Sequence, residues 1–153
     1  MTVVDSPVGD PMTRQETMGF LTHVGHGVLS LARDDRGYGI PVSYGYDDVD
    51  NQFLFEFLSI PPSRKQAFLA ASHEVTLTVY DVESPEEWVS AIVTGSIHHI
   101  PVTELSERAI ATTNQSVDAA QAVRWTGVDG LERDWYALVP TNITGRRRHA
   151  APC

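Results

Sequence analysis

The fold is decided by residues 37–81, which read GYGIPVSYGYDDVDNQFLFEFLSIPPSRKQAFLAASHEVTLTVYD. Runs rich in β-branched and aromatic residues predict strands at 38–46, 52–58 and 74–82, with polar turns between the first two. The paired prolines before Ser63 prevent a helix there, and the apolar spacing predicts one only at 64–72. Short strands joined by turns and one short helix are typical of an antiparallel sheet.

The regions on either side extend this pattern. Upstream, Thr13 and Glu16 form a capping box, which predicts a helix from Thr13 to about Gly25. A strand at 28–32 should then form a hairpin with residues 38–46. Downstream, the expected elements are a strand at 88–100, a helix capped by Thr103 that runs from about 104 to 112–114, a strand at 135–139 and a closing segment at 143–148. Residues 116–130 are expected to form a second helical turn and a loop.

The expected fold is mainly β, with about six antiparallel strands and short flanking helices. Strands do not alternate with long helices, which argues against a doubly wound parallel sheet. A small closed or partly open antiparallel barrel fits best because it leaves few exposed strand edges. A chain of 153 residues fits one domain, expected at 13–148 with flexible tails at 1–12 and 149–153.

Composition narrows the class of protein. A net charge of −9 argues against a binder of duplex nucleic acid, which needs clustered Lys and Arg. The acidic surface turns and the near absence of lysine resemble proteins adapted to high salt, so we expect a halophilic protein. No apolar run is long enough to span a bilayer and no secretory signal is visible, so we expect a cytoplasmic location. Cys153 is the only cysteine, which excludes an internal disulfide.

The residues Ser63, Arg64 and Lys65 form a compact basic triplet at the start of the 64–72 helix, and Lys65 is the only lysine in the chain. A helix start offers free N–H groups and the positive end of the helix dipole. A hydroxyl, a guanidinium fork and a mobile ammonium at that point could bind a phosphate. The alternative is an ordinary solvated helix start with two exposed cations.

The order of these segments resembles the pyridoxamine 5'-phosphate oxidase-like family of flavin-binding split barrels, and in particular its short, nitroimidazole-reductase-like group. The resemblance rests on residues 40–44, 53–57, 63–65, 75–79, 90–95 and 143–147. It implies a split barrel, FMN as cofactor, and a homodimer with the flavin at the interface.

The resemblance also implies roles for individual residues. Arg64 and Lys65 would bind the FMN phosphate with help from Ser63, and the strand from Pro41 to Tyr44 would run past the isoalloxazine ring. The complete set of implied cofactor-binding residues is Pro41, Val42, Ser43, Tyr44, Phe57, Leu58, Ser59, Ser63, Arg64, Lys65 and Ser90. Candidates for contacts from the second subunit are Trp125, Trp135 and Arg146.

The expected function is that of an FMN-dependent oxidoreductase that transfers electrons or a hydride from a reduced nicotinamide to a small molecule. Leu58 or one of its neighbours stands where many members of the resembled family have a histidine, and the chain lacks the Arg- and His-bearing ending of true pyridoxamine phosphate oxidases. The substrate and the catalytic residues therefore stay unassigned. The first alternative is a reductase that uses the deazaflavin F420, and the second is a non-catalytic flavin or haem binder. His26 or His99 could lie in the pocket, and no metal site is expected.

Overall fold

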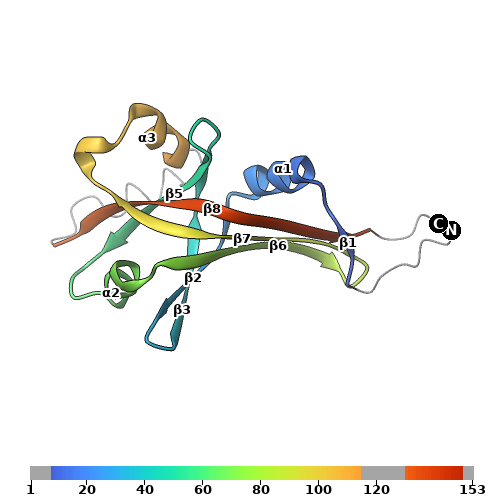
Figure 1. Cartoon of the computed structure of the whole chain (residues 1–153), viewed down its shortest axis with the longest axis horizontal. Helices are drawn as coiled ribbons and strands as arrows, with labels where there is room; N and C mark the ends of the chain where they lie inside the picture. The colour runs from blue at the N-terminus through green and yellow to red at the C-terminus, as the bar shows by residue number, and fades with distance from the viewer. Residues whose placement is uncertain (1–7, 115–129, 150–153) are drawn as a thin grey trace.

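A computed structural model describes residues 8–114 and 130–149 (Figure 1). Its elements in chain order are β1 (Asp10–Pro11), α1 (Arg14–Val24), β2 (His26–Arg33), β3 (Arg36–Ser43), β4 (Gly45–Asp47), β5 (Gln52–Ser59), α2 (Arg64–Ala71), β6 (Glu74–Ser84), β7 (Glu87–Ile100), the 3-10 turn η1 (Val102–Glu104), α3 (Glu107–Asn114) and β8 (Glu132–Arg148). The strands form a single sheet in the order β3-β2-β6-β7-β8-β5-β4, and β1 pairs with β8. Every pairing is antiparallel.

The predicted split barrel is confirmed. Six of the strands are long, as expected, and the two additional strands, β1 and β4, have only two and three residues. The sheet curls so that its two end regions approach each other without closing, because no pairing joins β3 to β5. The opening between them forms the candidate cofactor cleft.

The sequence signals around α1 are confirmed in detail. The Thr13 hydroxyl accepts a hydrogen bond from Glu16 N at 3.1 Å, and Thr13 N donates to Glu16 Oε1 at 3.0 Å. Gly25 ends the helix with a φ of 72°, a conformation that glycine adopts without strain. The helix buries Leu21 and lays Thr17 against Gly145 of β8.

The core lies on the concave side of the sheet. Phe53, Phe55 and Phe57 alternate along β5 and are buried there, next to Leu29 of β2 and Leu77 of β6. Leu54 points to the other side of β5 and is also buried, because α3 covers that side with Ala109. Strand β5 is therefore apolar on both faces along this part, which is why it reads as a nearly continuous apolar run.

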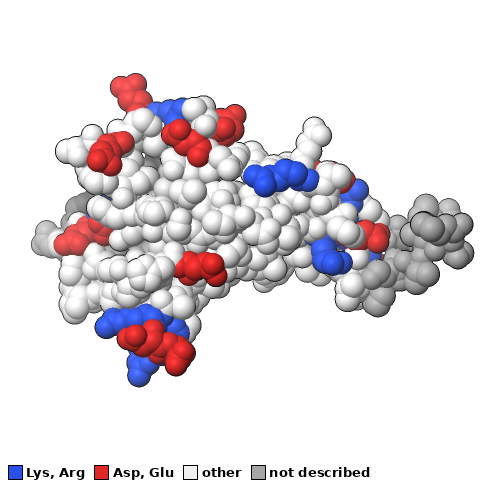
Figure 2. All heavy atoms as spheres, viewed as in Figure 1, with Lys and Arg blue, Asp and Glu red and all other residues white. Residues whose placement is uncertain are grey.

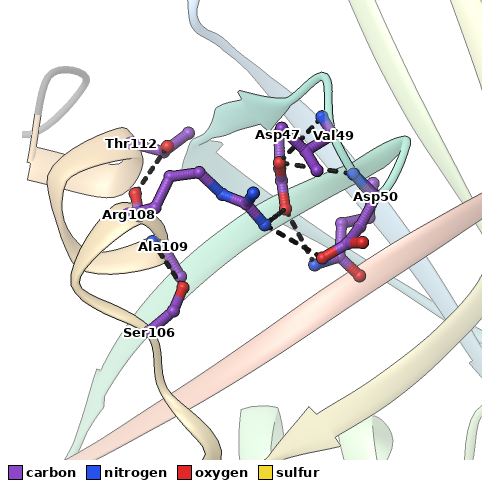
Figure 3. A network of polar contacts seen from close by, with 8 residues as sticks. Asp47, Val49, Asp50, Ser106, Arg108, Ala109 and Thr112 are labelled. Atoms are coloured by element: carbon purple, nitrogen blue, oxygen red, sulfur yellow. Dashed lines mark hydrogen bonds and ion pairs between the residues drawn. The ribbon is translucent and has the colours of Figure 1, made fainter.

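A polar network fixes α3 to the turn between β4 and β5 (Figure 3). The Asp47 side chain, only 1% exposed, accepts a hydrogen bond from Arg108 Nη2 at 3.1 Å and others from the backbone N–H groups of Val49 and Asp50. Arg108 also contacts Asp50 at 3.0 Å. Because a buried carboxylate needs such partners, this network determines where α3 can rest on the sheet.

Several boundaries differ from expectation. The strand expected at 38–46 is interrupted at Tyr44 and forms β3 and β4. Helix α3 begins at Glu107 rather than after Thr103, because Ser106 Oγ caps it by accepting from Ala109 N at 3.0 Å. The expected strand at 135–139 and the closing segment are one continuous strand of 17 residues, β8, in which the sheet tolerates Pro140 at a register shift opposite Gly95. Residues 10–12, expected within the flexible tail 1–12, lie along β8: Asp10 and Pro11 pair with it as β1, and Met12 N donates to Gly145 O.

Candidate cofactor cleft

A cleft opens where β3 and β5 diverge. Near the β4–β5 turn Gly45 pairs with Leu54, but beyond that pair the edge of β5 that faces β3 has no strand partner. The cleft has a volume of about 740 Å³, which is within the range of small-molecule and cofactor sites. Its lining residues are His26, Gly27, Ile40, Pro41, Val42, Ser43, Glu56, Phe57, Leu58, Ser59, Ile60, Lys65, Leu131 and Arg133.

Two free strand edges form the walls of the cleft. Strand β3 pairs only with β2, and residues 55–59 of β5 pair only with β8. Backbone N–H and C=O groups on these edges can therefore bind a ligand with a polar rim. Pro41, which pairs with Val28, has no N–H to offer, and a proline is tolerated on such an edge strand.

Lys65 supplies the positive charge at one end of the cleft. Its ammonium donates to Leu58 O at 2.9 Å and lies 5.7 Å from the centre of the Phe57 ring. Burial lowers the pKa of Lys65. A partly desolvated ammonium that contacts only a carbonyl and an aromatic ring among the described residues is suited to bind an anion.

Ser59 places a buried hydroxyl group at the cleft. It is 5% exposed, and its Oγ has no hydrogen-bond partner among the described residues. Leaving such a group unpaired costs free energy, so it indicates a place where a ligand atom could complete the hydrogen bonding. Ser59 and Lys65 both line the cleft, so a single ligand can satisfy the hydroxyl and the charge together.

The structure gathers seven of the eleven residues expected at the cofactor: Pro41, Val42, Ser43, Phe57, Leu58, Ser59 and Lys65. The other four lie elsewhere. Ser63 caps α2 by accepting a hydrogen bond from Gln66 N at 3.4 Å, and the Arg64 guanidinium lies 6.0 Å from the centre of the Tyr38 ring. Tyr44 is buried, and its hydroxyl donates to Leu21 O at 2.5 Å. Ser90 lies on β7, opposite Arg146 of β8.

The cleft contains an ion pair that no pattern in the sequence predicts. Arg133 Nη1 lies 3.2 Å from Glu56 Oε1, and both residues line the cleft. The two residues are far apart in the chain, and only the pairing of β5 with β8 brings them together. His26, one of the two histidines considered for the pocket, also lines the cleft, whereas His99 lies 3.7 Å from Asp134 and is not among the lining residues.

Within 8–114 and 130–149, no three or more His, Cys, Asp or Glu side chains are grouped so that they could hold a metal ion. In the same ranges, no helix has the length and apolar character needed to cross a membrane. Trp125, expected as a contact from the second subunit, lies outside the described residues.

Comparisons with known proteins agree with this architecture. A FAD-binding protein from Mesorhizobium loti superposes with a TM-score of 0.70 at 20% identity, covering 92% of this chain and 97% of that one. A candidate 5-nitroimidazole antibiotic resistance protein from Bacteroides thetaiotaomicron gives 0.65 at 16% identity, covering 90% and 86%. The uncharacterized protein RA0666 of Rhizobium meliloti is 26% identical over 93 residues, which are 61% of this chain and 58% of that protein.

The sequence profile described as "Pyridoxamine 5'-phosphate oxidase" matches residues 13–147. These residues include the long strands except Arg148 at the end of β8, the α-helices α1, α2 and α3, and the whole cleft. The chain belongs to the pyridoxamine 5'-phosphate oxidase family.

Proposed function

We propose that the cleft binds a flavin, FMN, and that the protein is a flavin-dependent oxidoreductase acting on a small molecule. The observation that carries this proposal is that one largely apolar cleft is lined both by the Lys65 ammonium and by the Ser59 hydroxyl, which has no hydrogen-bond partner among the described residues. A phosphate-bearing, flat aromatic ligand matches that combination. The FAD-binding protein of similar fold supports a flavin as the occupant.

The residues of the cleft fit FMN as follows. Lys65 would bind the phosphate, and the hydroxyl of Ser59 would donate to one of its oxygens. The free edges of β3 and β5 would meet the polar rim of the ring system, while Pro41 and Phe57 supply apolar contact. The bound flavin would supply the redox chemistry, and the protein would position it and shield it from water.

We further propose that the protein is a homodimer. Tyr80, Val82 and Ile92 are exposed on one face of β6 and β7, where no other part of the described chain covers them. Figure 2 shows that charged side chains gather toward the ends and margins of the molecule and are sparse over its middle. Ser90 lies opposite Tyr80 on the same face, so a Ser90 contact with flavin would have to be made with the cleft of the partner.

The deciding experiment is an absorbance spectrum of the purified protein, followed by denaturation and mass analysis of any released molecule. Flavin bands with FMN in the supernatant support the proposal, and release of FAD would keep the flavin while changing its form. Release of F420 would replace the flavin by a deazaflavin. A colourless protein that also fails to bind added FMN, FAD or F420 would refute the proposal.

Enzymatic turnover is tested separately. The holoprotein should oxidise a reduced nicotinamide in the presence of an electron acceptor, and the Lys65→Met variant should lose that activity together with the flavin. If the protein binds flavin but transfers no electrons to any acceptor tested, it is a flavin carrier or sensor rather than an enzyme.

A further inference from the structure

Arg133 stands at the same level of the cleft as Lys65. In the register of β5 with β8, Arg133 pairs with Leu58, and the Leu58 carbonyl accepts the hydrogen bond from the Lys65 ammonium. Lys65 reaches this level from the first turn of α2, whereas Arg133 comes from β8, on the other side of β5. Both line the cleft, so two cationic side chains from distant parts of the chain border it at one level.

The guanidinium of Arg133 keeps most of its donors available. Its Nη1 atom lies 3.2 Å from Glu56 Oε1, and this is its single polar contact among the described residues. A guanidinium has five N–H donors. The side chain of Glu56 is 10% exposed and that of Arg133 is 44% exposed. Glu56 therefore holds one part of the fork, and the remaining N–H groups can bind an oxyanion in the cleft.

The charges at this level suit a phosphate. Two cations close to one ligand site repel each other in the empty cleft, and the Glu56 carboxylate offsets part of that cost. A phosphate monoester carries about 1.5 to 2 negative charges at neutral pH. The single charge of Lys65 does not balance it, whereas Lys65 and Arg133 together do.

We propose that Arg133 is the second cation of the cofactor phosphate site, and that it makes the cleft prefer a flavin phosphate over the unphosphorylated flavin. The assignment rests on the proposed function, in which Lys65 binds that phosphate. The sequence predicts Arg64 for this role, but its guanidinium lies at the Tyr38 ring and does not line the cleft. Arginine can bind two phosphate oxygens through parallel N–H bonds, so Arg133 adds geometric selectivity as well as charge.

The contribution of the phosphate is the ratio of the affinities for FMN and riboflavin, since these ligands differ only in the phosphate group. Each affinity would be measured at low ionic strength by fluorescence titration of the full-length protein after any bound flavin is removed. Arg133→Gln should lower the ratio about tenfold or more, because charge-assisted hydrogen bonds are lost, and should leave riboflavin affinity within about twofold. Arg36→Gln, which removes an exposed arginine outside the cleft, is the matched control and should change neither affinity.

Two further variants separate a direct contact from a change in charge. Arg133→Gln leaves the Glu56 carboxylate unpaired, and that charge alone would repel a phosphate. The double variant Glu56→Gln with Arg133→Gln restores the net charge of the wild-type cleft, and its ratio should stay low because the guanidinium donors are still missing. Arg133→Lys keeps the charge and loses the fork, so its ratio should lie between those of the wild type and Arg133→Gln. It also replaces Arg133→Gln if that variant fails to fold.

Several results would overturn the inference. An unchanged ratio in the Arg133 variants would do so, as would an equal loss in Arg36→Gln or a double variant that regains the wild-type ratio. A loss in Arg64→Gln with none in Arg133→Gln would return the role to Arg64.

Failure of the proposed function has a different signature. If neither FMN nor riboflavin binds the wild type, the flavin is wrong, and phenyl phosphate then tests Arg133. Phenyl phosphate should slow the acylation of Lys65, the only lysine, and should need about tenfold higher concentration to do so in Arg133→Gln. No protection in the wild type, or equal protection in both proteins, would overturn the role of Arg133 as well.

Discussion

At the scale of single residues, Lys65 allows an unusually clean chemical test because the chain has no other lysine. Burial lowers its pKa, so at a given pH more of this amine is neutral than in an exposed lysine. An acylating reagent should label Lys65 in the folded protein at a lower pH than in the unfolded protein. Bound FMN should slow the labelling strongly. Mass analysis of the peptide containing Lys65 measures both effects, and labelling unaffected by FMN would contradict the phosphate assignment.

The lowered pKa of Lys65 also predicts how this residue affects the free energy of unfolding. The folded protein binds the proton of Lys65 less tightly than the unfolded chain, so this group lowers the free energy of unfolding below the folded pKa. That loss disappears as the pH rises through the folded pKa to the unfolded one. In the absence of cofactor, Lys65→Met should therefore be at least as stable as the wild type at neutral pH, as measured by urea unfolding. A clear destabilisation would mean that the hydrogen bond from the ammonium to Leu58 O outweighs the cost of burying the charge.

Substitution of Ser59 should weaken FMN binding without lowering the free energy of unfolding. Its buried hydroxyl has no partner in the described structure, so Ser59→Ala should leave the free energy of unfolding unchanged or raise it. The affinity for FMN should fall by about twofold to tenfold, the equivalent of one lost hydrogen bond.

Ser72→Ala is the contrasting control for Ser59. Its buried hydroxyl donates to Phe68 O or Ala32 O and accepts from Ala32 N. This substitution should lower the free energy of unfolding by about 1–3 kcal/mol and leave FMN affinity intact. If Ser59→Ala instead behaves like Ser72→Ala, the Ser59 hydroxyl has a structural role and the cofactor role assigned to it is wrong.

At the scale of elements, the docking of α3 depends on Asp47. Replacing Asp47 by Ala leaves Arg108 without its buried acceptor and three further donors without theirs. We expect the free energy of unfolding to fall by about 1–3 kcal/mol. Asp50→Ala is the matched control, because its side chain is 62% exposed although it contacts the same arginine. The control should cost less than about 1 kcal/mol, and equal losses would show that the network adds little beyond surface charge pairing.

The sequence predicted elements well where local chemistry determines them. The capping box of α1, the hairpin of β2 and β3, and Ser63 as the cap of α2 all follow from neighbouring residues. The start of α3 was misplaced because Thr103 and Ser106 are both good caps, and only the packing on β5 selects Ser106. The ion pair of Glu56 with Arg133 could not be predicted, since it depends on the register of two distant strands.

At the scale of the whole molecule, the proposed dimer predicts that Ile92→Glu produces a monomer. A carboxylate placed in an apolar interface would have to be desolvated, which costs more than the association gains. Sedimentation velocity at micromolar concentration measures the mass of the particle. Val49→Glu, at an exposed position in the β4–β5 turn, is the control and should stay dimeric. A wild-type protein that is already monomeric would contradict the dimer.

The charge of the whole chain predicts a dependence on salt. With a net charge of −9, mutual repulsion destabilises the folded state, and added salt screens it. The melting temperature should rise as KCl increases from about 0.1 M to about 2 M. A variant with Asp48→Asn, Glu83→Gln and Glu86→Gln, all at exposed positions, should depend less on salt. The halophilic origin stays a prediction, and a melting temperature that falls with salt would contradict it.

The place of β8 in the sheet has a consequence for how the protein is made. This strand is the last of the described elements in the chain, yet it lies between β7 and β5 and pairs with both. During synthesis on a ribosome, the hairpin of β4 and β5 therefore has no edge to join until β8 has emerged. The cleft, whose one wall is β5, can form only after β8 has been synthesised, so the proposed flavin could bind only after that point.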